Sequence, residues 1–121
     1  MNWTDTAVMG QIERYLDLVT YREKLVVGNI ANIDTPHYHT LDIDFRSELR
    51  RAALSAEGGS SEGMPPKVRE AAGLLERPDG NNVNVDRESM LLAETQLEFR
   101  IGVQLLRGGF QRLMSAIKEG S

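Results

Sequence analysis

The chain has 121 residues, a mass of 13.5 kDa and a net charge of -4, which leaves room for one folded domain. Its 18 acidic residues outnumber its 14 Lys and Arg residues, so we expect no nucleic-acid partner, because a general nucleic-acid surface needs clustered cations. Cysteine is absent, which excludes disulfide bonds, thiolate metal ligands and a cysteine nucleophile.

Membrane and secretory signals are not found in the sequence. No uninterrupted apolar run approaches the ~20 residues that span a bilayer. No Lys or Arg precedes Arg14, and no apolar segment typical of a secretory signal lies near the N-terminus. We therefore expect neither a transmembrane segment nor a cleaved signal peptide.

An amphipathic helix is predicted over residues 6–33. Apolar residues recur there in alternating steps of three and four, which places them on one stripe of a helix or a coiled-coil seam. The stripe consists of Met9, Ile12, Leu16, Val19, Glu23, Val26, Ile30 and Ile33, with Glu23 as its polar member. Thr4 or Asp5 is expected to cap the start of the helix. Pro36 is expected to end it, because proline lacks an amide hydrogen and disfavours helical geometry at Thr35.

The middle of the chain carries weaker signals. Residues 40–45 alternate apolar and polar side chains, a period of two that indicates a short extended segment. Residues 46–56 could add one or two helical turns, and residues 68–75 a short ordered piece. Between them, residues 57–66 are rich in Gly, Ser and Pro, which is typical of a flexible linker. Residues 78–81, with the sequence PDGN, predict a turn.

A second long helix is predicted to begin near Asn84 or Asp86, because either residue is a good N-cap. Its apolar positions form two adjacent rows, a face wider than one partner helix covers. One row is Leu92, Gln96, Phe99, Val103, Leu106, Phe110, Leu113 and Ile117, and the other is Met90, Ala93, Leu97, Ile101 and Leu105. Gly108 and Gly109 lie inside this helix and indicate either a local weak point or the close approach of another helix.

These elements predict a mainly α fold. Long N- and C-terminal helices pack as a coiled-coil-like pair, a short extended segment follows the first helix, and the middle is flexible. Residues 1–54 would hold the N-terminal helix, the turn motif and the extended segment, residues 55–80 a flexible linker or small variable region, and residues 81–121 the C-terminal helix, all within one structural unit. Neither helix has an internal partner large enough to cover it, which indicates a subunit that assembles.

Few residues suggest chemistry. His37 and His39 would face the same side of an extended strand near Asp42 and Asp44, as a pair of metal ligands could. The H-x-H spacing is a weak signal without a third ligand, and a polar surface turn explains it better. No Gly-rich phosphate loop, catalytic Ser/His/Asp order or pair of buried carboxylates stands out. We predict no catalytic residues, no metal site, no cofactor and no enzyme activity.

Residues 29–38, with the sequence NIANIDTPHY, resemble a signature of the bacterial flagellar axial proteins, the rod, hook and filament-junction subunits, which is roughly A-N-x-A-N-x-x-T-P-G-Y. The matching motif residues are Asn29, Ala31, Asn32, Asp34, Thr35, Pro36 and Tyr38. Residues 41–45, 79–83, 86–88 and 92–94, with apolar positions between 106 and 117, resemble the proximal rod proteins of that family, the FlgB group. His37 stands where the family usually has Gly. Either the turn is not left-handed there, or His37 tolerates some strain.

The resemblance implies a structural subunit of the flagellar basal body that builds the proximal rod, transmits motor torque and is required for flagellum assembly and motility. It implies export from the cytoplasm without a cleaved signal peptide, assembly in the periplasm, and termini that become ordered only against neighbouring subunits. The implied partners are the flagellar type III export apparatus, further copies of the chain, rod subunits of the FlgC, FlgF and FlgG types, and the rod-base protein FliE.

The motif residues are expected to set the end of the first helix and the turn into the extended segment. Intersubunit contacts are expected from the two helices, at Ile12, Leu16, Val19, Val26, Ile30, Phe99, Val103, Leu106, Phe110, Leu113 and Ile117. Such stripes also form ordinary intramolecular pairs, so a helical adaptor or dimeric coiled-coil interaction protein is the alternative. The alternative predicts a stable dimer, whereas a rod subunit should be weakly folded alone and gain helix with its partners.

Overall fold

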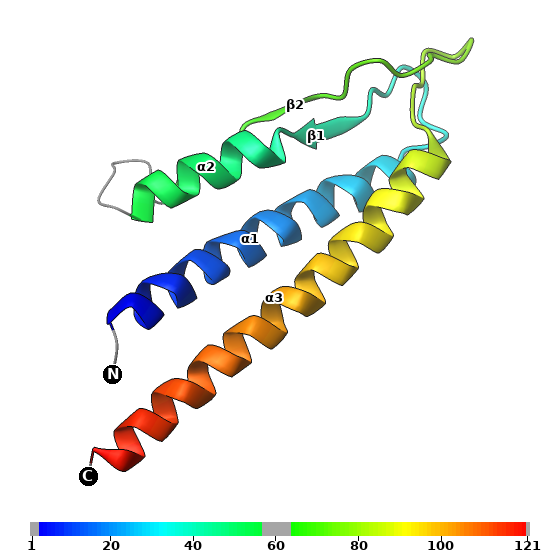
Figure 1. The fold of residues 1–121 in the computed structure, drawn as a ribbon. Coiled ribbons are helices and arrows are strands. Elements are labelled where there is room, and N and C mark those ends of the chain that lie inside the picture. Colours follow the sequence, from blue (N-terminus) through cyan, green and yellow to red (C-terminus); the bar gives the residue numbers. More distant parts are fainter. Residues whose placement is uncertain (1–2, 57–63, 121) are drawn as a thin grey trace.

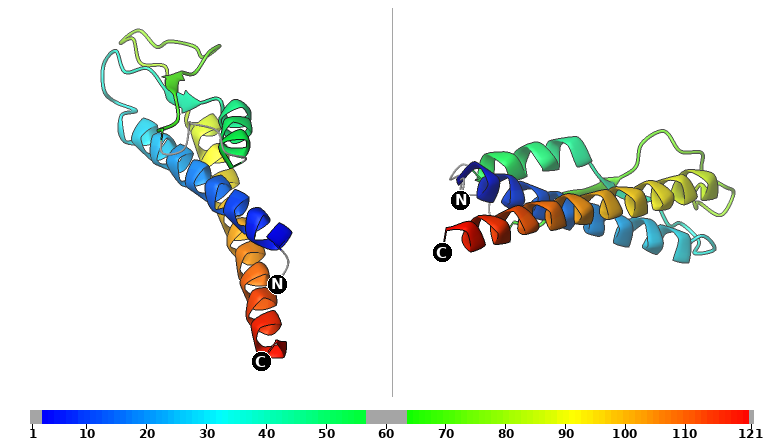
Figure 2. Two further views of the ribbon diagram at one scale, coloured as in Figure 1. Left: turned by 90° about the vertical axis from the view of Figure 1, so that its left-hand side faces the viewer. Right: turned by 60° about the horizontal axis from the view of Figure 1, so that its bottom comes forward.

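A computed structural model describes residues 3–56 and 64–120. Its elements follow in the order α1 (Trp3–Ala31), β1 (Leu41–Ile43), α2 (Phe45–Ala56), β2 (Val68–Glu70) and α3 (Val85–Glu119). α1 contacts both α2 and α3 and lies between them (Figure 1). α1 and α3 run antiparallel, and α1 ends and α3 begins at the end of the pair that lies far from both termini (Figure 2). The predicted mainly α fold with two long packed terminal helices is confirmed.

α1 differs from the prediction at both ends. It begins at Trp3, so Thr4 and Asp5 lie inside the helix and do not cap it, contrary to the prediction. Nothing in residues 3–5 is a helix breaker, so the helix continues through them. At the other end α1 stops at Ala31, where the amide of Asn32 still donates to the carbonyl oxygens of Gly28 (3.1 Å) and Asn29 (3.2 Å) before the chain turns.

The two strands pair antiparallel, with Leu41 opposite Glu70 and Ile43 opposite Val68. β1 confirms the predicted extended segment but is short, because Phe45 already begins α2. α2 confirms and lengthens the helical turns predicted over residues 46–56, and β2 lies within the ordered piece predicted over residues 68–75. Of the predicted linker, residues 57–63 lie outside the described residues.

α3 begins where one of the two predicted caps lies. Asn84 is the N-cap, and its side chain accepts a hydrogen bond from the amide of Arg87 at 3.0 Å. The helix then continues unbroken through Gly108 and Gly109 to Glu119. A Cβ at Gly109 would lie 3.0 Å from Met9 Cγ of α1, so this glycine marks the close approach of another helix.

Gly102 makes an even closer contact that the sequence did not reveal. A Cβ there would lie 2.4 Å from Leu16 Cδ2 of α1. Gly102 and Gly109 are both buried and stand one heptad apart, so they line up on the same seam of α3. The backbones of α1 and α3 can come together along this seam because these two positions carry no side chain.

The core is small and lies where α1, β1 and the first turns of α3 meet. Among the described residues its buried apolar side chains are Leu18, Val19, Val26, Ile43, Val83 and Leu91. Much of the interior is polar, since Asn29, Thr40, Asn81, Glu88 and Thr95 are also fully buried or nearly so. Every buried side-chain nitrogen or oxygen in the described ranges has a hydrogen-bond partner. None of the helices in these ranges is long and apolar enough to cross a membrane.

Candidate functional site

Asn29 of α1 forms hydrogen bonds with β1 and α3, at the end of the α1–α3 pair that lies far from both termini. Its side chain is fully buried. Its Oδ1 accepts from the hydroxyl of Tyr38 (2.9 Å) and from the amide of Leu41 (3.0 Å), and its Nδ2 donates to the carbonyl oxygen of Leu41 (2.9 Å) and to Glu88 Oε2 (3.2 Å). The side-chain amide therefore pairs with both backbone groups of a β1 residue, as a neighbouring strand would. Its hydrogen-bonding capacity is fully used.

The turn after α1 is held by the segment that precedes α3. Asn81, also fully buried, donates from Nδ2 to the carbonyl oxygens of Asn32 and Thr35, both at 2.9 Å. These carbonyl groups lie past the end of α1, where no helical partner is available to them. Asn82 continues the contact, because its Oδ1 accepts from the amide (2.7 Å) and the hydroxyl (2.9 Å) of Thr40.

The motif residues divide into two groups. Asn29, Asn32, Thr35 and Tyr38 take part in these side-chain or backbone hydrogen bonds. Within the turn, Asn32 Oδ1 accepts from Thr35 Oγ1 at 3.0 Å. The remaining motif residues are exposed at the surface of the turn, and they are Ala31, Asp34 and Pro36.

A cluster of charged side chains lies next to Asn29. Asp42 accepts from Nε and Nη2 of Arg22 (both 3.0 Å), from Nη2 of Arg87 (2.7 Å) and from the amide of Ile43 (2.8 Å). Arg87 also donates to the buried Glu88 at 2.5 Å. Burial by itself raises the pKa of Asp42, but the hydrogen bonds from Arg22 and Ile43 outweigh it and hold that pKa below its ordinary value. The cluster ties α1, β1 and α3 together with paired charges.

His37 has a φ of 65°, in the left-handed region that favours glycine. Of the two alternatives left open above, the structure supports the one in which His37 tolerates strain. Its amide donates to the carbonyl oxygen of Asp79 at 2.9 Å. Gly80 lies against it with a φ of 85°, and a Cβ at Gly80 would be 2.5 Å from His37 Nδ1. Position 80 therefore requires glycine for its conformation and for its contact with His37.

The other histidine of the H-x-H pair, His39, is bound by carboxylates. Its Nε2 lies 3.0 Å from Glu76 Oε1 and its Nδ1 lies 3.2 Å from Glu70 Oε2, and these hydrogen bonds raise the pKa of His39 above 6.5. The strand that would have placed both histidines on one side begins only at Leu41, and His37 is not extended, so that premise was wrong. In the ranges that the structure describes, no group of three or more His, Cys, Asp or Glu could hold a metal ion.

The side of α3 that packs against α1 carries several polar or small residues, while many apolar residues of α3 are exposed. The buried seam positions are Glu88, Leu91, Thr95, Gly102 and Gly109. Apolar residues on either side of this seam are 42 % to 62 % exposed, and they are Met90, Leu97, Phe99, Ile101, Leu105, Phe110, Met114 and Ile117. The predicted rows are therefore only partly used within the chain, because Leu92, Val103, Leu106 and Leu113 are half-buried while the other apolar members are exposed.

The predicted interface residues are distributed unevenly over this arrangement. Val19 and Val26 are buried inside the single chain, so here they are core residues. Those that are half-buried are Ile12, Leu16, Ile30, Val103, Leu106 and Leu113. Those that are exposed are Phe99, Phe110 and Ile117, all on α3.

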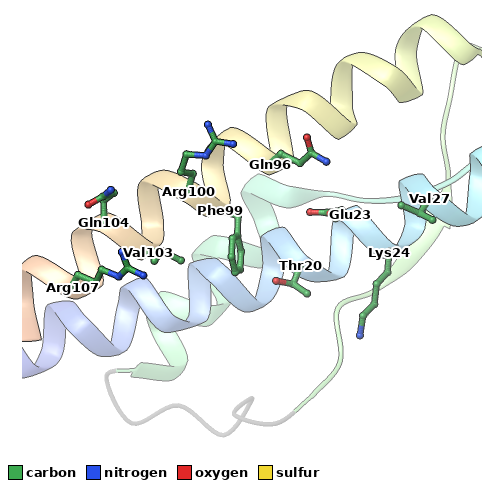
Figure 3. A pocket seen from close by; sticks show the side chains of 10 residues that line it. All are labelled: Thr20, Glu23, Lys24, Val27, Gln96, Phe99, Arg100, Val103, Gln104 and Arg107. Carbon is green, nitrogen blue, oxygen red and sulfur yellow. The ribbon is translucent and has the colours of Figure 1, made fainter.

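A groove of about 960 Å³ lies between α1 and α3. Its apolar lining includes Val27, Phe99 and Val103, and Phe99 extends from α3 toward α1 (Figure 3). Charged side chains line it as well, namely the cationic Lys24, Arg100 and Arg107 and the anionic Glu23. An apolar floor with charged edges suits a protein segment better than a small metabolite.

No protein-family model matches the chain. Curated proteins do match it along nearly its whole length. It is 33 % identical to the flagellar basal body rod protein FlgB of Salmonella typhimurium over 134 aligned residues, which cover 97 % of this chain and 96 % of that protein. It is 38 % identical to FlgB of Cereibacter sphaeroides, with 91 % and 93 % covered, and 29 % identical to FlgB of Escherichia coli. The chain belongs to the FlgB family.

FlgB proteins are structural subunits of the flagellar basal body rod, and this chain is one of them. For such a subunit the functional sites are surfaces rather than a catalytic pocket. In the described part of this FlgB chain, the exposed α3 residues and the α1–α3 groove are open to neighbouring proteins.

Several residues of the site were not predicted from the sequence. Asn29 was assigned to the helix end, but it connects α1 with β1 and α3. A signal was present, because Asn29 follows Val26 by three positions and so continues the buried stripe of α1. Asn81 was seen only as part of a turn, and no local pattern distinguished Glu88 from a solvated first-turn carboxylate. These polar residues could be recognised only once the elements were packed.

Proposed function

We propose that this chain builds the proximal part of the flagellar rod, transmits motor torque and is required for flagellum assembly and motility. The observation that carries the proposal is the row of exposed apolar residues on α3, in a chain of the FlgB family whose own core is small. Soluble monomers seldom expose contiguous apolar surface of this kind, because water penalises it. Neighbouring subunits would cover it. The role is structural and involves no catalysis.

We call the buried hydrogen-bonded cluster around Asn29, Asn81 and Asp42 the polar junction, and it supports a role in transmitting torque. Hydrogen bonds are directional, and those of Asn29, Asn81 and Asp42 cross between α1, β1 and the start of α3. Sliding α1 along α3 would break several of them at once. We therefore propose that the junction keeps the two long helices in register while the assembled rod rotates.

The proposal extends to location and partners. The chain would leave the cytoplasm through the flagellar type III export apparatus without losing a cleaved signal, and it would assemble in the periplasm. Its neighbours would be further copies of itself, rod subunits of the FlgC, FlgF and FlgG types, and the rod-base protein FliE. Support comes from the resemblance of residues 29–38 to the axial-protein signature and from the family of its relatives.

Deletion of the gene in its host, followed by complementation, tests this function. Cells without the chain should lack rod, hook and filament, and the intact gene should restore all three. Phe110→Asp should fail to restore them, because it places a carboxylate in an apolar contact surface while the exposed Phe110 contributes little to the fold of the single chain.

Gln111→Asp is the matched control, since it adds the same charge at the neighbouring exposed position. It should restore swimming. Normal basal bodies in the deletion strain would contradict the proposed function, and normal rods with Phe110→Asp would contradict the surface assigned to it.

A further inference from the structure

The two apolar surfaces of α3 carry opposite charges. Successive residues of an α-helix are rotated by about 100°, so Leu97 and Phe99 point about 200° apart, on opposite sides of the seam that faces α1. We call the surface around Phe99 the basic groove, whose apolar lining includes Val27, Phe99 and Val103 and whose charged lining is Lys24, Arg100 and Arg107 with one carboxylate, Glu23. We call the other surface the acidic ridge, made of Met90, Glu94, Leu97, Ile101 and Leu105.

The basic groove has unused cationic groups. Lys24, Arg100 and Arg107 are exposed, and none of them takes part in an ion pair within the described part of the chain. Val27 and Phe99 at its floor are 50 % and 42 % exposed. A partner helix that brought apolar side chains together with a carboxylate would cover the floor and neutralise the rim.

The acidic ridge has that composition. Leu97, Ile101 and Leu105 are each about half exposed and follow one another by four residues, so they form a continuous apolar line. Glu94 is exposed one turn before Leu97 on the same side of the helix. Glu98 adds a second negative charge beside this line, although it is partly buried and bonded to the hydroxyl of Tyr15 at 3.0 Å.

We propose that the basic groove of one copy receives the acidic ridge of a second copy. The proposal rests on the function proposed above and specifies how copies of the chain contact one another. Because the two surfaces differ, the contact is heterologous, and each added copy leaves one groove and one ridge available for the next. Pairing groove with groove would set two net cationic linings against each other, because each holds three cations and one carboxylate, and pairing ridge with ridge would set two acidic surfaces against each other. Both arrangements are disfavoured by like-charge repulsion.

Disulfide cross-linking tests the contact directly, because the chain has no cysteine of its own. Leu97→Cys places a thiol on the ridge of α3 and Thr20→Cys places one in the groove on its α1 side, both at exposed positions. Mild oxidation of the mixture should give mostly the mixed 97–20 dimer, at least tenfold over either homodimer. Leu75→Cys, at a large apolar side chain that is 93 % exposed and lies outside α3, is the control and should not cross-link to either. Dominant 20–20 homodimers would overturn the proposal and favour a symmetric dimer.

Charge exchange gives an independent test. Glu94→Lys alone replaces the exposed carboxylate of the ridge by a cation that faces the basic groove, and Arg100→Glu alone places a second carboxylate in the groove that faces the acidic ridge. Each variant should self-associate at least tenfold more weakly than the parent chain in analytical ultracentrifugation. An equimolar mixture of the two should recover association, because every contact in an alternating chain then joins opposite charges. Glu119→Lys, an equal change of net charge near the end of α3, should leave association unchanged. A mixture that stays as weak as its components would overturn the proposal.

The outcomes separate this inference from the function on which it rests. If the deletion strain lacks rods but the mixed variants fail to associate and to cross-link, the chain is a rod subunit whose copies meet through other surfaces. If the deletion strain builds normal rods, the proposed function fails, whatever the groove binds in solution.

Discussion

Replacing Asn29 by Ala should cost more stability than any other single asparagine-to-alanine change at the junction. The side chain is fully buried and pairs both the amide and the carbonyl group of Leu41, as well as the hydroxyl of Tyr38. A polar group left unpaired inside a protein costs ~1–3 kcal/mol, so the two groups of Leu41 together account for about 2–6 kcal/mol. The middle of that range, about 4 kcal/mol, approaches the whole stability of a small domain, which is ~5 kcal/mol at the low end.

Urea unfolding of the full chain, followed by the helical circular dichroism signal, measures this loss. A constant concentration of trimethylamine oxide keeps the parent chain folded at the start of the titration, because this osmolyte strengthens burial. Asn84→Ala is the control, since Asn84 is exposed and accepts one bond at the N-cap of α3, where such a change costs ~1 kcal/mol. Equal losses for the two variants would refute the view that Asn29 holds the junction together.

Three further outcomes follow from particular contacts. Gly102→Leu should push α1 away from α3, because even the added Cβ would lie 2.4 Å from Leu16 Cδ2, and it should lower the free energy of unfolding by ~1–3 kcal/mol. Gly108→Ala, whose added Cβ would have no atom closer than 3.7 Å, should stabilise α3 by up to ~1 kcal/mol. Equal effects of the two changes in urea titrations would argue against the seam. Gly80→Ala should destabilise the turn, because it adds a Cβ at a φ of 85° and 2.5 Å from His37 Nδ1, and the additional change His37→Gly should recover part of the loss. The folded-state pKa of Asp42 lies below its ordinary value of 3.8, so its contribution to stability is complete above about pH 4 and is lost as the pH falls through the folded pKa. Asp42→Asn should therefore flatten the dependence of the unfolding free energy on pH below about pH 4. An unchanged pH dependence in this acidic range would contradict the assignment.

The long helices could be predicted because their apolar residues recur with the helical period over many turns. Which apolar residues face inward could not. Gly102 and Gly109 let α1 approach one side of α3, so the intramolecular seam buries only part of the apolar rows and leaves Phe99 and Phe110 about half exposed. Judged by hydrophobicity and helix propensity alone, a glycine only weakens a helix. In the packed structure, a glycine can decide which face of the helix is buried.

The motif turn shows a second limit. Pro36 and the polar residues before it correctly predicted that α1 stops, since these effects act through the local backbone. The partners of Asn29 lie on β1 and α3, and those of Asn32 include Asn81, far along the chain. Such bonds depend on the packed arrangement of elements, so a single sequence does not specify them. The resemblance of residues 29–38 to axial proteins identified the family before these contacts were known.

That residues 55–80 form a flexible linker or small variable region remains a prediction. Part of this range is bound to the rest of the chain by hydrogen bonds. The amide of Ala71 donates to the carbonyl oxygen of Thr40 at 2.9 Å, and β2 pairs with β1. This strand lies in the ordered piece predicted over residues 68–75, and it can form there because a short strand needs only a partner edge and little apolar surface of its own.

Cryo-electron microscopy of basal bodies isolated from the host, with and without the gene, tests the central claim most directly. We expect density for this chain in the proximal rod, with α1 and α3 paired along the Gly102–Gly109 seam and with Phe99 and Phe110 buried against neighbouring subunits. A rod that lacks the chain, or one in which these residues of α3 still face solvent, would contradict the account.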